Sequence, residues 1–275
     1  MSPIKARFWF LLGLLALTRA ASAANVDGAN VHWTSAGSGA QTVIFVHGWT
    51  CDDSSWSAQV PAFSARYRVI TLDLPGHGKS AAPAGGKFSM QNFARAIEAV
   101  RVEAGVDRVV VVGHSMGTPV IRTYQLMFPQ HVAGMVIVDG AVLLPGTPSG
   151  FTPPNVAGPE GLTAREGMIR SMFSAATTPA LQEHILKMML GAPEATAVGA
   201  MNAMFGDPSW QSAEPVKVPV LAVFAANSQL DDSPAMKTVF PAAEVHEVPG
   251  TGHFLMLEKP AEFNKLLGDF LAKIH

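Results

Sequence analysis

One serine in this sequence stands in a context that suits nucleophilic chemistry. The sequence GHSMG at residues 113–117 follows four consecutive valines, which predict a strand buried on both faces. The glycines permit a sharp turn into a helix that begins near Thr118, with Pro119 in its first turn. A strand, a tight turn and a helix are typical of a nucleophile elbow, so Ser115 is the predicted nucleophile.

A serine hydroxyl is a weak nucleophile and needs a base beside it. His253 follows the last predicted strand, at residues 245–248, and precedes a helix predicted over residues 258–274. A histidine at the carboxyl end of a strand can reach the crevice in which open α/β sheets hold their ligands. The chain order, serine before histidine, is also that of serine hydrolases with this architecture. We therefore expect His253 to be the general base.

Acyl transfer also requires N–H groups that stabilise an oxyanion. The backbone N–H of Met116, the residue after the nucleophile, is the first predicted donor. The second is expected in the His-Gly-Trp turn after the strand predicted at residues 42–46, and the N–H of Trp49 is the candidate. His47 is interpreted as a residue that holds this loop.

The elements that must position these residues follow from the hydrophobic pattern. Apolar runs alternate with helical patterns, which predicts an α/β fold whose mostly parallel sheet is covered by helices on both faces. Residues 26–31 are expected to form a hairpin through an Asp-Gly turn. Strands are predicted at residues 42–46, 68–72, 109–112, 135–138, 220–224 and 245–248, and helices at 54–65, 88–104, 119–128 and 258–274.

Residues 141–213 interrupt this alternation and are expected to form a helical cap. A stretch rich in proline and glycine precedes three amphipathic helical patterns. Helices inserted between two strands would lie above the strand ends. Methionines cluster in this interval, and their flexible thioethers adapt to irregular apolar ligands.

The N-terminus is typical of a signal peptide over residues 1–23. Lys5 and Arg7 precede an apolar run at residues 8–17, which is about half the length that spans a bilayer, and small residues follow at 21–23. We expect cleavage after Ala23 or Ala24, a mature hydrolase domain over residues 24–275, and a secreted or periplasmic location. Later residues contain no second apolar run of spanning length, so stable membrane insertion of the mature chain is not expected.

The amino-acid composition limits the classes of partner and cofactor that we expect this chain to bind. Charged residues make up 15% of the 275 residues and the formal net charge is −2, so neither nucleic acid nor an anionic membrane is indicated. With a single cysteine, no intramolecular disulfide is expected. The sequence has no zinc-ligand spacing and no glycine-rich phosphate loop, and we expect no metal and no cofactor. It does not indicate an oligomeric state.

Four motifs together resemble the α/β-hydrolase fold superfamily, and within it the capped branch of esterases, lipases and haloperoxidase-like enzymes. They are GHSMG, the turn HGW at residues 47–49, DLPGHGKS at 73–80 and GTGHFLMLEKP at 250–260. The resemblance spans nearly all of residues 25–275. It implies an eight-stranded, mostly parallel sheet with helices on both faces and a helical cap. The pair Thr118-Pro119 replaces a common Gly-Gly of that branch and is expected to narrow the pocket floor.

For the acid that orients the base, the sequence offers three candidates. In the resembling family an aspartate most often follows the strand matched here by residues 220–224, but Ser228 stands at that position. Asp139 directly follows the preceding strand, where some family members carry their acid, and it is our first candidate. Asp231 and Asp232 remain as alternatives. Each would hold the imidazole tautomer and stabilise the imidazolium without taking the proton.

A serine nucleophile indicates acyl transfer, because the relatives that attack alkyl carbon use an aspartate. The expected activity is hydrolysis of small carboxylic esters through an acyl-enzyme. A lactonase, an amidase, a carbon–carbon hydrolase or a cofactor-free perhydrolase would use the same residues. The remaining alternative, from another class, is a non-catalytic ligand-binding relative.

Overall fold

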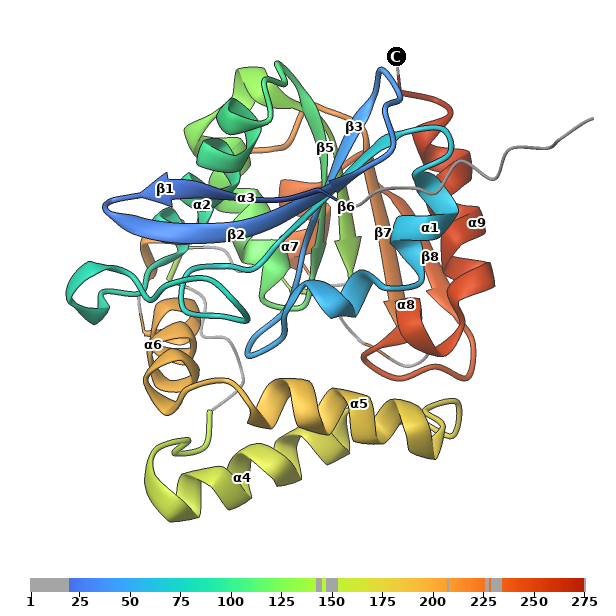
Figure 1. Ribbon diagram of the computed structural model, residues 1–275. Helices are drawn as coiled ribbons and strands as arrows, with labels where there is room; N and C mark the ends of the chain where they lie inside the picture. Colours follow the sequence, from blue (N-terminus) through green and yellow to red (C-terminus); the bar gives the residue numbers. More distant parts are fainter. Residues whose placement is uncertain are drawn as a thin grey trace, which may run out of the picture.

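A central sheet carries helices on both faces, and a group of helices lies beyond one end of it (Figure 1). The computed structural model describes residues 20–141, 145–146, 153–206, 208–225, 228 and 234–274. The strands of the sheet are β1 (Ala20–Val26), β2 (Ala29–Ala36), β3 (Thr42–Val46), β4 (Arg68–Leu72), β5 (Val109–His114), β6 (Val132–Val138), β7 (Val220–Ala225) and β8 (Glu244–Val248).

The eight strands are ordered β1-β2-β4-β3-β5-β6-β7-β8. Strand β2 is antiparallel to both of its neighbours, whereas β4, β3, β5, β6, β7 and β8 are mutually parallel. All four valines of β5 are fully buried, as expected of a central parallel strand covered on both faces. The predicted fold class, an eight-stranded, mostly parallel α/β sheet, is confirmed.

The helices divide between the two faces of the sheet. Helices α2 and α3 pack together on one face, and α1 and α9 lie together on the other (Figure 1). The helices of the body are α1 (Gln59–Phe63), α2 (Met90–Glu103), α3 (Gly117–Met127), α7 (Pro234–Val239), α8 (Leu255–Glu258) and α9 (Pro260–Leu271).

Two of the predicted helices differ from the observed ones at a proline. The segment predicted at 54–65 forms a 3₁₀-helix, Asp53–Trp56, and then α1, whose first turn contains Pro61. The segment predicted at 258–274 forms α9, which Pro260 opens, and residues 255–258 just before it form the separate short helix α8. A proline lacks the N–H that a continuous helix requires, so the second helix of each pair begins just before or at the proline.

Helices α4 (Gly158–Ser171), α5 (Pro179–Leu190) and α6 (Glu194–Phe205) lie between β6 and β7 in the chain and form a cap. Figure 1 shows them together beyond the carboxyl ends of the parallel strands. Two hydrogen bonds fasten α6 to the body. The Trp49 Nε1–H donates to the carbonyl of Ala197 over 2.9 Å, and the Thr196 hydroxyl donates to the carbonyl of Gly76 over 2.7 Å.

The predicted hairpin at the start of the domain is present. Strands β1 and β2 are antiparallel and are joined by Asp27 and Gly28, both with positive φ (51° and 85°). Residues 1–19, which hold most of the predicted signal peptide, lie outside the described residues. The cleavage positions expected after Ala23 or Ala24 fall within β1, where these residues pair with His32 and Val31.

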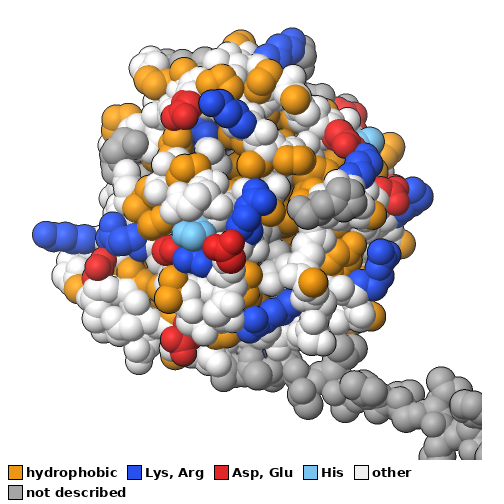
Figure 2. Space-filling view, turned by 90° about the horizontal axis from the view of Figure 1, so that it is seen from above, with side chains coloured by type: hydrophobic (Ala, Val, Ile, Leu, Met, Phe, Trp, Pro, Cys, Tyr) orange, Lys and Arg blue, Asp and Glu red, His pale blue; other side chains and the backbone are white. Residues whose placement is uncertain are grey.

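The surface carries charges of both signs. The face in Figure 2 shows lysine, arginine and acidic side chains interspersed with scattered hydrophobic ones, in keeping with the small net charge. Among the helices in the described part of the chain, none is long and apolar enough to cross a membrane.

Candidate active site

Ser115 lies at the tip of a strained turn between β5 and α3. Its φ is +53°, a left-handed conformation that a serine rarely adopts, and its N–H donates to the carbonyl of Val138 over 3.0 Å. The flanking glycines are sterically required. A Cβ on Gly113 would lie 2.4 Å from the carbonyl oxygen of Gly117, and one on Gly117 would lie 2.6 Å from that of Val46. The predicted elbow is therefore present in the structure.

His253 and Asp139 form a hydrogen-bonded pair at the carboxyl ends of β8 and β6. The distance between His253 Nδ1 and Asp139 Oδ2 is 2.6 Å, and the other carboxylate oxygen accepts the N–H of Ala225 over 2.9 Å. Burial of Asp139 opposes its ionisation. The hydrogen bonds and the neighbouring imidazole outweigh that effect and lower the pKa of the carboxyl.

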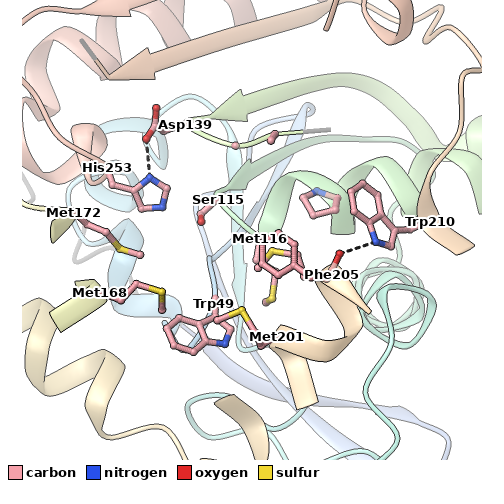
Figure 3. Close-up of a pocket in the computed structure, with 14 residues that line it drawn as sticks. Trp49, Ser115, Met116, Asp139, Met168, Met172, Met201, Phe205, Trp210 and His253 are labelled. Carbon is pink, nitrogen blue, oxygen red and sulfur yellow. Dashed lines mark hydrogen bonds and ion pairs between the residues drawn. The ribbon is translucent and has the colours of Figure 1, made fainter. Parts of the chain in front are cut away.

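This pairing fixes the imidazole tautomer. A proton on Nδ1 donates to Asp139 and leaves Nε2 free to accept one. The His253 side chain is 21% exposed, and it faces the same cavity as Ser115 (Figure 3). Asp139 thus occupies the place predicted for the acid. Asp231 and Asp232 lie outside the described residues.

The two predicted oxyanion donors lie beside the nucleophile. Neither the N–H of Trp49 nor that of Met116 has a hydrogen-bond acceptor among the described residues, which leaves both for a ligand. The loop after β3 approaches the elbow closely, since a Cβ on Gly48 would lie 3.1 Å from Cβ of Ser115. This packing brings the N–H of the next residue, Trp49, to the reaction centre.

His47 holds that loop in place, as predicted. Its Nδ1 lies 2.8 Å from the carbonyl of Gly48, and its Nε2 accepts the N–H of Leu74 over 2.9 Å. Because Nε2 accepts a hydrogen bond, the ring proton is on Nδ1, and both nitrogens have a hydrogen-bond partner. His47 therefore has a structural role in joining the loops after β3 and β4.

His114 is a contributor that sequence reasoning did not identify. Its Nε2 lies 2.8 Å from the carbonyl oxygen of His253, and the two rings are 4.7 Å apart. It is the second residue of GHSMG and ends β5, so its side chain is fully buried beneath the elbow. The strand was predicted to end at Val112, and it continues to His114, so the only signal in the sequence was a polar residue two positions after a buried strand.

An apolar cavity of about 330 Å³ opens above Ser115 and His253, between the body and the cap. Its walls are almost wholly apolar, and no described residue that lines it is a lysine or an arginine. Figure 3 shows Met168 and Met172 on the His253 side of Ser115, and Phe205 and Trp210 on the opposite side. The apolar side chains of the walls are Trp49, Met116, Pro119, Ala141, Met168, Met172, Met201, Met204, Phe205 and Trp210.

Comparison with known proteins agrees with this geometry. The sequence model of the α/β hydrolase family matches residues 43–266 of this chain. The chain belongs to the α/β hydrolase family. In sequence it is 30% identical over 255 residues to the dihydrolipoyllysine-residue acetyltransferase component of the acetoin cleaving system of Cupriavidus necator, covering 89% of this chain and 67% of that protein.

Two further relatives of this α/β hydrolase are hydrolytic or degrading enzymes by name. A 2-hydroxy-6-oxononadienedioate/2-hydroxy-6-oxononatrienedioate hydrolase of Paraburkholderia phymatum is 29% identical over 270 residues, covering 88% of this chain and 91% of that protein. The solved structure of Est816, an N-acyl homoserine lactone degrading enzyme, has a TM-score of 0.77 and 28% identity, covering 90% of this chain and 100% of that one.

Two other histidines of the hydrolase are fully buried near this site. His77 packs between the rings of His47 and Phe93, at centroid distances of 5.0 and 5.8 Å, and His114 lies beneath His253. Burial lowers the pKa of both imidazoles to about 3, from 6.5. Both imidazole rings are therefore uncharged at pH values near 7.

These buried imidazoles predict a loss of stability in acid. Between pH 6.5 and about 3 the unfolded chain binds a proton at each histidine that the folded chain does not. The free energy of unfolding should therefore fall as the pH drops through this window, by up to about 1.4 kcal/mol per pH unit for each histidine. Urea unfolding at pH 7, 6 and 5 measures the slope. His77→Gln should reduce it, whereas exposed His246→Gln should not, and equal slopes in wild type and His77→Gln would contradict the assignment.

The Asp139–His253 pair predicts a second outcome. Asp139→Asn keeps the size of the side chain but offers an amide that favours the wrong imidazole tautomer, so kcat should fall by about 10⁴-fold. A matched Asp269→Asn variant removes an exposed carboxylate on α9 and should leave kcat unchanged. Steady-state kinetics on the best ester substrate provides the test, and an Asp139→Asn enzyme with nearly wild-type kcat would remove Asp139 from the triad.

Proposed function

We propose that this chain is an exported serine esterase that cleaves apolar carboxylic esters through an acyl-enzyme intermediate. The observation that carries the proposal is the 2.6 Å contact between His253 and Asp139, with the imidazole facing the cavity that holds Ser115. A strained serine, a base with a fixed tautomer and two unpaired N–H groups are the parts that acyl transfer requires.

The reaction follows from these positions. Ser115 Oγ attacks the ester carbonyl while its proton passes to His253 Nε2, and the N–H groups of Trp49 and Met116 stabilise the oxyanion. Collapse of the tetrahedral intermediate breaks the bond to the alcohol, which takes the proton from His253. Water, deprotonated by the same imidazole, then attacks the acyl-enzyme and restores Ser115. Asp139 stabilises the imidazolium in both halves.

The cavity supports an apolar substrate rather than a dicarboxylate. The hydrolase of Paraburkholderia phymatum is named for a dioate, whose second carboxylate would need a cationic or hydrogen-bonding partner once desolvated. The described walls contain neither lysine nor arginine, and the sequence places none at residues 142–144, 147–152, 207, 226–227 or 229–233. This favours an ester over the carbon–carbon hydrolase alternative.

A lactone is the second candidate substrate. A lactone is a cyclic carboxylic ester, so the same nucleophile, base and oxyanion donors would open it. The similarity to an N-acyl homoserine lactone degrading enzyme, together with an apolar cavity of about 330 Å³, supports this possibility. Titration of the acid released from unsubstituted and N-acylated lactones separates a lactonase from an esterase restricted to open-chain substrates.

Export belongs to the same proposal and rests on the charge and hydropathy pattern of residues 1–23. Mass spectrometry of the protein from a periplasmic fraction, expressed from the full sequence, measures the mature N-terminus. A chain beginning at Ala24 or Asn25 supports the proposal. Intact protein confined to the cytoplasm contradicts it.

The activity itself can be tested with a panel of p-nitrophenyl esters. The wild-type protein should hydrolyse esters of apolar acids, and Ser115→Ala should lower kcat by about 10⁶-fold because the triad acts as a unit. A fluorophosphonate should label wild type once, at Ser115. The matched control, Ser57→Ala, removes an exposed hydroxyl and should keep full activity. Absence of both turnover and labelling in wild type would favour the non-catalytic ligand-binding alternative.

Because no lysine or arginine lines the described walls of the cavity, we predict that the enzyme distinguishes a neutral from an anionic ester of the same chain length. We expect kcat/KM for p-nitrophenyl hexanoate to exceed that for the half-ester p-nitrophenyl adipate by at least about 100-fold. An unpaired carboxylate in an apolar cavity costs several kcal/mol. Both rates are measured between pH 6 and 8, where the free carboxylate of the adipate half-ester is ionised. Equal kcat/KM values would show that the cavity accepts an anion, and would reopen the dicarboxylate alternative.

A further inference from the structure

The backbone of His253 is held from two sides. Its carbonyl lies 2.8 Å from His114 Nε2, in the elbow of the body. Its N–H donates to the carbonyl of Met172, the C-cap residue of cap helix α4, over 3.1 Å. Figure 3 shows Met172 beside His253 at the edge of the cavity. The cap therefore contributes a direct hydrogen bond to the residue proposed as the base.

The connection between α4 and α5, residues 172–178, lies against the loop that carries His253. A Cβ on Gly252 would lie 2.5 Å from the carbonyl oxygen of Met172 and 3.1 Å from the N–H nitrogen of Ser174. Only a glycine permits this approach without movement of one backbone. The cap and the loop are thus in close contact at the residue before the base.

Glu258 bridges the same two segments. One carboxylate oxygen accepts the N–H of Gly252, and the other accepts the hydroxyl of Thr177. The Thr177 hydroxyl donates the second bond because a carboxylate only accepts, and the same hydroxyl oxygen accepts the N–H of Ser174 over 2.8 Å. Thr177 is buried, whereas Gly252 and Glu258 are partly buried.

We propose that Glu258 and Thr177 are positioning residues that couple the seating of the cap to the alignment of His253. The proposal rests on the proposed function, since it assigns His253 as the base. When the cap is seated, the bridge fixes Gly252, and the carbonyl of Met172 fixes the N–H of His253. When the connection moves away, both hydrogen bonds break and the base loses its alignment with Ser115. The cap thus controls catalysis as well as enclosing the substrate.

The magnitude can be estimated from geometry. Displacement of a catalytic group by about 1 Å can lower the rate about 10²-fold. One broken bridge leaves the His253–Asp139 hydrogen bond and the contact from His114 intact, so we expect a smaller displacement. Thr177→Val and Glu258→Ala should each lower kcat about 10-fold, with KM changed less than about twofold.

The conservative variants separate positioning from folding. Thr177→Ser keeps the hydroxyl and should retain wild-type kcat. Glu258→Gln keeps one oxygen that can accept from Gly252 and should lie between wild type and Glu258→Ala. Thr178→Val is the matched control, because it removes the hydroxyl that caps α5 but leaves the bridge untouched. It should lower the melting temperature of the protein without lowering kcat.

Two measurements give the decision. Steady-state kinetics on a p-nitrophenyl ester separates kcat from KM, and the rate of fluorophosphonate labelling reports the reactivity of Ser115 without ester turnover. A parallel fall of kcat and labelling rate in Thr177→Val, restored in Thr177→Ser, supports the proposal. Unchanged rates in both Thr177→Val and Glu258→Ala, or an equal loss in Thr178→Val, would overturn it. Labelling without ester turnover in wild type would instead refute the esterase assignment, while the labelling rates of the variants still test the coupling.

Discussion

The left-handed backbone at Ser115 constrains the geometry of the whole site. Residues in such conformations cost about 1–3 kcal/mol each and persist only where their surroundings enforce them. Here β5, α3 and the loop after β3 close around the turn, at contacts with the backbone that only Gly113 and Gly117 permit, and with a tight approach at Gly48. One steric arrangement therefore exposes the hydroxyl and brings beside it two N–H groups that have no acceptor among the described residues. The position of the oxyanion site is a consequence of the same turn that presents the nucleophile.

The body and the cap contribute different kinds of side chain to the site. The polar groups that face the reaction, Ser115, His253 and Asp139, come from the carboxyl ends of β5, β8 and β6. The cap adds mainly apolar side chains, four of them methionines, whose flexible thioethers can adapt to ligands of irregular shape. Substitution in the cap can thus change the substrate while the body keeps the chemistry. The bridge through Glu258 limits this independence, because the α4–α5 connection also touches the loop of the base.

The sequence predicted what depends on local pattern and missed what depends on distant contact. The valine run and its flanking glycines identified β5 and the elbow, because burial and turn geometry are local requirements. Asp139 could be ranked but not chosen from sequence, since its role depends on a hydrogen bond to His253, 114 residues away. Neither Glu258 nor the carbonyl of Met172 left a local signal, because both act on the loop of His253 through its backbone N–H groups. Helix α7 was also missed, because a helix of only six residues is too short to show a helical repeat of apolar residues.

Four histidines gather around the elbow, and their surroundings give only one of them a free nitrogen facing the cavity. In His47 both nitrogens are engaged with backbone groups, and burial keeps His77 and His114 neutral. An imidazole that stays neutral can donate a hydrogen bond without competing for the proton of Ser115. His253 alone among them combines a carboxylate partner with exposure to the cavity. In the proposed mechanism a proton taken from Ser115 therefore has one destination, and the buried histidines can support the loops of the site without diverting it.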